Sequence, residues 1–179
     1  MPTKVSKSLL FLALASASTA ALAADAERSA PQPAVFVQKA AQSGLAEIAA
    51  AQAALQKSQD PGIRSYAERM VKDHGKANTE LATLARSKGI DAPAHLDAEH
   101  KAQVDKLTSK TGSEFDRNYA EHMNMDHSKA IALFESATKI PDADLAGFAR
   151  KTLPTLREHK QLAEKLPGKQ PVTGSSVGG

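Results

Sequence analysis

RSYAERMVKDHGKA at residues 64–77 returns as RNYAEHMNMDHSKA at residues 117–130. Each copy centres on a histidine, His74 or His127, at the midpoint of a run whose apolar residues recur at helical spacing. A third histidine, His159, lies in a later run of the same kind. A histidine on the core side of a helix needs a hydrogen-bond acceptor, a buried water or a metal ion as its partner. The repeat therefore predicts a polar cluster inside a helical bundle.

The periodicity predicts four long helices and a short one between the second and the third. Asp60, Ser113 and Asp142 are the expected N-caps of the second, third and fourth long helices. Pro61 suits the first helical position and Gly89 a helix stop. The expected long helices cover about 34–58, 61–88, 114–140 and 143–166, and the short helix covers about 97–108. No run alternates between apolar and polar residues, so no strands are expected.

These helices predict an all-α fold, a four-helix bundle about 37 Å long at the usual rise of about 1.5 Å per residue. The longest connection, residues 90–112, joins the second and third long helices. It is either a crossover, as in ferritin-like bundles, or a folded-over loop.

The N-terminus has the features of a secretory signal peptide. Lys4 and Lys7 precede a short apolar run, and Ala21-Leu22-Ala23 forms a cleavage signal. We therefore expect a periplasmic or otherwise exported protein with no membrane span after cleavage. The expected organisation is a signal peptide at 1–23, a flexible leader at 24–33, a bundle domain at 34–166 and a disordered tail at 167–179.

Composition excludes several functions. The formal net charge of +3 includes two lysines of the signal peptide, so the mature chain is nearly neutral, and only 4% of residues are aromatic. Neither a basic surface nor stacking platforms are available for nucleic acid. The chain contains no cysteine, which excludes thiol catalysis and thiolate metal ligands. It also lacks the nucleophile-elbow, phosphate-loop and zinc-protease motifs.

Four candidate ligands lie at similar depth on the four long helices: Glu47, His74, His127 and His159. Side chains at equal depth in a bundle converge on one cross-section, where bundles build metal sites. Glu47 lies at the edge of the apolar stripe of its helix. Three imidazoles and one carboxylate suit a single Cu, Zn, Ni or Fe ion.

Five further residues are weaker candidates. Met70 and Met123 each precede a histidine by four residues, so their thioethers share its face and would favour copper if they bound it. Methionine at helical spacing also serves as ordinary core filler. Asp73, Asp126 and Glu158 each precede a histidine directly and lie about 100° around the helix from it. They are expected at most to support the ligands from outside.

Four segments together carry a family resemblance. They are Phe36-x-x-x-Ala40 with Gly44-x-x-Glu47, Met70-Val71-x-Asp73-His74, Phe115-Asp116-x-x-Tyr119 with His127, and Leu153-Pro154-x-Leu156-x-x-His159. In this order and spacing the chain resembles, over 35–166, the exported bacterial family known as domain of unknown function 4142. The resemblance implies a ferritin-like four-helix fold outside the cytoplasm and no established activity. Its motif falls on the four candidate ligands named above.

Ferritin-type di-iron chemistry is disfavoured. Such sites need Glu-x-x-His on two helices and a further Glu on each of the other two. The residues three before the histidines are Val71, Asn124 and Leu156, so only Glu47 supplies an inward carboxylate.

Three interpretations of the cluster stay open: a closed hydrogen-bond network that fixes helix register, a bound transition-metal ion, and a proton-sensitive switch or small-ligand pocket. The expected function is that of an exported, non-enzymatic binding or envelope-stress protein. The alternatives are a mononuclear metal oxidoreductase and a structural bundle that acts through a protein partner.

Overall fold

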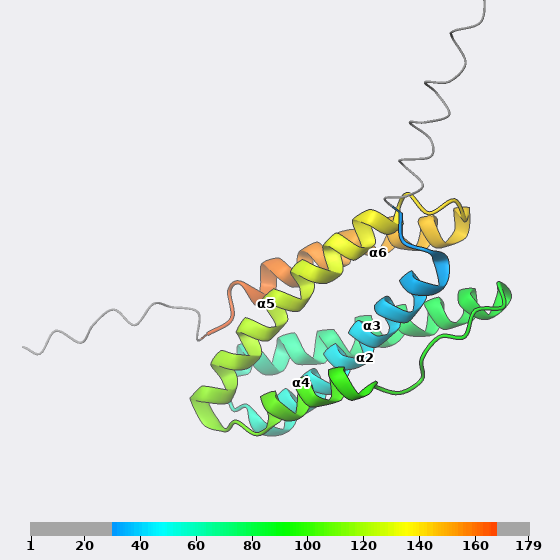
Figure 1. The fold of residues 1–179 in the computed structure, drawn as a ribbon. Helices are drawn as coiled ribbons and strands as arrows, with labels where there is room; N and C mark the ends of the chain where they lie inside the picture. Colours follow the sequence, from blue (N-terminus) through cyan, green and yellow to red (C-terminus); the bar gives the residue numbers. More distant parts are fainter. Residues whose placement is uncertain (1–29, 168–179) are drawn as a thin grey trace, which may run out of the picture.

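A computed structural model describes residues 30–167, and this part of the chain is all-helical (Figure 1). The helices are α2 (Pro33–Lys57), α3 (Pro61–Ser87), α4 (Ala98–Thr108), α5 (Gly112–Ala137) and α6 (Ala143–Ala163). The described residues contain no strand, and the predicted fold class is confirmed. The predicted signal peptide lies outside the described residues.

The predicted N-caps are confirmed at two of three positions. The Oδ1 atoms of Asp60 and Asp142 accept hydrogen bonds from backbone N–H groups three residues on, at 2.9 and 3.0 Å. The prediction for Ser113 is wrong, because α5 begins at Gly112 and Thr111 takes the N-cap position without a side-chain bond. Gly112 has a φ of 56° and makes the entry turn itself, which places Ser113 inside the first helical turn.

The predicted stop at Gly89 is confirmed. Its φ of 68° is in the left-handed region, where glycine carries no Cβ penalty. The N–H of Ile90 donates to the carbonyl of Ala85 at 2.9 Å, and the N–H of Gly89 donates to that of Arg86 at 3.1 Å. This pair of bonds satisfies carbonyls that the helix end would otherwise leave unpaired.

The four long helices form a closed ring in the order α2, α3, α6, α5, and α4 lies along the outside of α2 and α5. The connection that contains α4 runs the length of the bundle. Near one end Gln38 Nε2 donates to the carbonyl of Asp91, and near the other Lys57 Nζ donates to that of Lys110. The connection is therefore a crossover, and the bundle is ferritin-like.

This crossover explains the sequence repeat. Because α3 and α5 each pack on both α2 and α6, they lie across the bundle from each other. They also run in the same direction, since Tyr66 faces Tyr119 near their starts and His74 faces His127 farther along, with ring centroids 6.2 and 5.5 Å apart. Two parallel helices with the same spacing place like residues in the same layers of the core.

Two apolar clusters fill the bundle on either side of a polar layer. One cluster includes Phe36 and Phe134, and the other includes Tyr66 and Tyr119. On every long helix the buried residues of the two clusters are separated by about one turn or more. The three histidines of the predicted cluster and Glu47 lie in this gap, so apolar side chains close the polar layer at both ends.

No helix among residues 30–167 has the length and apolar character needed to cross a membrane.

One glycine in α2 permits a close side-chain approach. A Cβ added at Gly44 would collide with the amide group of Asn78 on α3. Asn78 Nδ2 in turn lies 3.5 Å from the carbonyl of Ala41. Gly44 thus allows a polar side chain to enter the core one turn from His74.

Gly44→Ala should gain less stability in chemical unfolding than the usual helix preference for alanine over glycine, because the end of the Asn78 side chain must move to make room for the added Cβ. In an Asn78→Ala background the same change should instead stabilise by about 0.5–1 kcal/mol, the usual helix preference for alanine over glycine. Equal effects in the two backgrounds would contradict the packing argument.

Candidate metal centre

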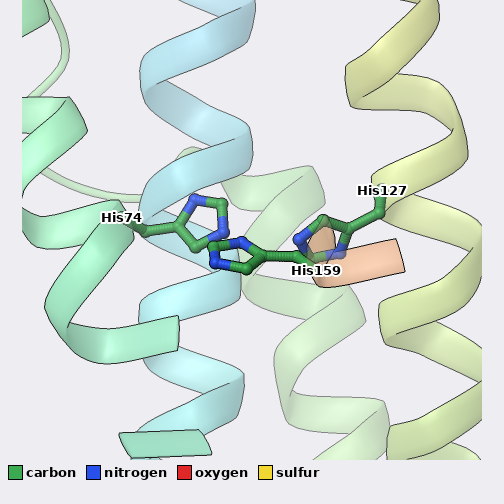
Figure 2. Close-up of side chains that lie close together, drawn as sticks. All are labelled: His74, His127 and His159. Carbon is green, nitrogen blue, oxygen red and sulfur yellow. The ribbon is translucent and has the colours of Figure 1, made fainter. Parts of the chain in front are cut away.

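Each long helix contributes one buried side chain to the polar layer: Glu47 from α2, His74 from α3, His127 from α5 and His159 from α6. Their exposed fractions are 1%, 6%, 0% and 0%. Figure 2 shows the three imidazoles entering the same space from three helices. The ring centroids lie 5.3–5.5 Å apart, and one ring nitrogen from each histidine lies within 4.8 Å of the other two.

The carboxylate of Glu47 lies against this triangle. Its Oε2 atom is 2.7 Å from Nε2 of His74 and 3.7 Å from Nε2 of His127. The short contact pairs the carboxylate with the ring of His74. The other oxygen, Oε1, accepts a hydrogen bond from Ser43 Oγ at 3.3 Å, which orients the carboxylate.

Two of the imidazoles are oriented by partners outside the triangle. Nδ1 of His127 lies 2.8 Å from the carbonyl oxygen of Met123, and Nε2 of His159 lies 3.0 Å from Oδ2 of Asp73. Both oxygens can only accept, so these outward nitrogens carry protons. When the ring is neutral, the inward nitrogen, Nε2 of His127 or Nδ1 of His159, therefore carries the lone pair.

The inward atoms are Oε2 of Glu47, Nε2 of His74, Nε2 of His127 and Nδ1 of His159. The first two pair with each other at 2.7 Å, and the inward nitrogens of His127 and His159 have no hydrogen-bond partner among the described residues. Buried polar atoms are normally paired, and leaving one unpaired costs about 1–3 kcal/mol. Ligands about 2.0–2.1 Å from a tetrahedral ion lie about 3.4 Å apart, so small side-chain movements would bring these four atoms to one ion.

The charges within the layer are tightly coupled. Burial would raise the pKa of Glu47, but the neighbouring charges of His74 and His127 lower it to about 2. Burial would lower the pKa of His74, but the charge of Glu47 raises it above its usual value. The pKa of His159 falls to about 4, because burial and the charges of the other two histidines outweigh its bond to Asp73. Without a metal, Glu47 and His74 therefore form the charged pair of the layer.

The three acidic neighbours predicted from sequence take different positions. Asp73 contacts His159 of the neighbouring helix α6, and it also accepts a bond from Arg69 Nε at 3.3 Å. Glu158 pairs with the same Arg69 at 2.7 Å, one step farther from the cluster. Asp126 lies outside the cluster and pairs with His122 at 3.0 Å.

Sequence reasoning missed two features around the site. His122 lies five residues before His127, about 140° around the helix, which predicts an exposed side chain. Only 15% of it is exposed, because α4 lies over the adjoining part of α5. Ser43 was not singled out, although its position four residues before Glu47 was a usable signal. Met70 and Met123 are fully buried in the apolar cluster beside the histidines, and a role for their sulfurs as ligands stays a prediction.

These features define a ferritin-like four-helix bundle with a buried His/Glu layer. The sequence model of the domain of unknown function DUF4142 matches residues 17–166, and the chain belongs to this family.

Two solved structures share the fold. One is a DUF305 fragment from Deinococcus radiodurans, with a TM-score of 0.67 and 20% identity over 75% of this chain and 93% of that one. The other is a conserved hypothetical protein from Mycobacterium tuberculosis, with a TM-score of 0.60 and 15% identity over 86% of this chain and 98% of that one. No curated protein matches the sequence.

The metal-free protein should lose stability as the pH falls from about 6.5 to about 4. In this range the unfolded chain protonates His159 while the folded chain leaves it neutral, so the free energy of unfolding should fall by up to about 1.4 kcal/mol per pH unit. Urea unfolding at a series of pH values measures this slope.

His159→Gln provides the control for this prediction. The lowered pKa of Glu47 changes the free energy of unfolding only at pH values below its ordinary pKa of 4.5. The raised pKa of His74 changes it only at pH values above 6.5. The slope between pH 4.5 and 6.5 should therefore disappear in this variant, and a slope that persists would show that another group is responsible.

Proposed function

We propose that this exported protein binds one divalent transition-metal ion through His74, His127, His159 and Glu47. The observation that carries the proposal is the arrangement of their inward atoms. Four buried donor atoms meet in one layer: Glu47 and His74 pair with each other, whereas the inward nitrogens of His127 and His159 have no hydrogen bond and are oriented by partners outside the cluster. Metal-binding histidines usually have this kind of outer partner, a carbonyl or carboxylate on the second ring nitrogen.

A purely structural network explains this arrangement less well. In such a network the inward atoms would hydrogen-bond to one another, because unpaired buried donors and acceptors reduce stability. Here the outward nitrogens of His127 and His159 have good partners and the inward ones have none.

The donor set indicates a borderline metal ion. Three imidazoles and one carboxylate suit Zn²⁺, Cu²⁺, Ni²⁺ or Fe²⁺. Binding would displace the proton that His74 shares with Glu47, so affinity should fall as the pH is lowered. The role we propose is binding, with no reaction assigned to the protein.

Native protein purified without chelator should contain close to one metal ion per chain by mass spectrometry. His127→Ala should abolish this content, because it removes a ligand that no nearby side chain replaces. His122→Ala is the matched control: it lies on the same helix but pairs with Asp126 outside the cluster, so its metal content should be unchanged.

Stability separates the two interpretations of the cluster. If the cluster is a metal site, the metal-free His127→Ala variant should be about as stable as the metal-free parent. Metal at about 100 times Kd should then stabilise the parent by about 2.7 kcal/mol and leave the variant unchanged. A parent that takes up none of the four ions, together with a variant destabilised by about 1–3 kcal/mol, would support the structural network instead.

Asp73→Ala should weaken metal binding by about 10–100-fold, because it removes the carboxylate that orients His159. Asp126→Ala removes an aspartate at the equivalent position of the repeat that does not contact the cluster, and its affinity should match the parent. Competition titration with a chromophoric chelator measures both values. Equal losses in the two variants would show that general destabilisation, rather than ligand orientation, is responsible.

A further inference from the structure

A small cavity lies beside the candidate centre, on the side of Glu47 and His74 that faces the Phe36 cluster. Its volume is about 20 Å³. A cavity of about 10–15 Å³ on this measure is enough for one water molecule. The space is therefore large enough for water or a diatomic molecule and too small for an organic substrate.

The wall of the cavity is partly polar and partly apolar. Ser43, Asn78 and Thr152 add polar groups to the two ligands, and the rest of the wall is apolar. Thr152 Oγ1 donates to a carbonyl of its own helix, and Ser43 Oγ donates to Glu47. The amide of Asn78 makes only the long 3.5 Å contact to α2, so it is the group best able to hydrogen-bond a guest molecule.

Gly44 shapes this wall because it has no side chain. The missing side chain at Gly44 is what admits the Asn78 amide to the core. Asn78 lies four residues after His74 and therefore on the same face of α3. Alanine at position 44 would favour the helix α2 more than glycine does. Gly44 instead leaves room for the Asn78 amide next to the metal ligands.

Thin walls separate the cavity from solvent on two sides. Ser43 and Ala130 line both the cavity and a surface groove beside α4. Ala77 and Thr152 line both the cavity and a surface depression between α3 and α6. Small side-chain movements at either wall would admit a molecule of one or two non-hydrogen atoms.

We infer that the metal centre keeps one exchangeable coordination position, facing this cavity, for water or a diatomic molecule such as dioxygen or nitric oxide. The inference rests on the proposed metal site and specifies which additional ligand the bound ion could accept. The four protein ligands hold the ion, the cavity admits one small additional ligand, and Asn78 donates a hydrogen bond to it.

Pulsed EPR of the Cu²⁺-loaded protein in heavy water tests this inference. The parent should show the strong deuterium modulation of a directly coordinated water. Asn78→Leu and Thr152→Leu, which fill the cavity from two different helices, should lose it while retaining one Cu²⁺ per chain. Ile63→Leu is the matched control, because it changes a buried residue of α3 in the apolar cluster on the opposite side of the polar layer, and it should behave as the parent.

The outcomes separate the two proposals. A parent that binds Cu²⁺ stoichiometrically but shows no coordinated water overturns the exchangeable position and leaves the metal site intact. Modulation that survives in both filled variants also overturns it, since water would then reach the ion from elsewhere. A parent that binds no Cu²⁺, Zn²⁺, Ni²⁺ or Fe²⁺ overturns both proposals.

Discussion

The buried carboxylate of Glu47 is the constraint on which the rest of the structure depends. An ionised carboxylate that is 1% exposed must be compensated by positive charge, because its removal from water is otherwise too costly. Its compensation comes from the other three long helices, with His74 at ion-pair distance and His127 next nearest. Pairing this carboxylate therefore fixes how the helices are positioned along the bundle axis relative to one another. The apolar clusters on either side keep water from reaching the carboxylate and solvating it instead.

The crossover gives the internal repeat its meaning. In a bundle with short connections throughout, the second and third long helices would be antiparallel neighbours, and equal spacing would place equivalent residues at opposite ends. The α4 connection instead makes α3 and α5 parallel and places them across the core from each other. The same fourteen-residue pattern then builds matching tyrosine, methionine and histidine layers from both sides.

The sequence contained most of the fold and part of the candidate site. Helical periodicity, two aspartate caps and Gly89 predicted the helices because these signals act within a few residues. The path of residues 90–112 was not predictable, since a crossover and a folded loop need similar lengths. The spacing placed Asp73 about 100° around α3 from His74 but did not indicate its partner, which is His159 of another helix. Such pairings depend on how each helix is rotated about its axis relative to its neighbours. The spacing of residues within one helix does not determine that rotation.

Each hairpin carries half of the polar layer. The α2–α3 hairpin supplies Glu47 and His74, and the α5–α6 hairpin supplies His127 and His159. An ion held between them would be a crosslink, and its escape would require the halves to part rather than a single ligand to swing away. Residence time would then depend on opening of the whole bundle together with rupture of the metal–ligand bonds that join its halves, so the protein would release its ion slowly. Such kinetics suit long-term retention of a metal better than rapid delivery.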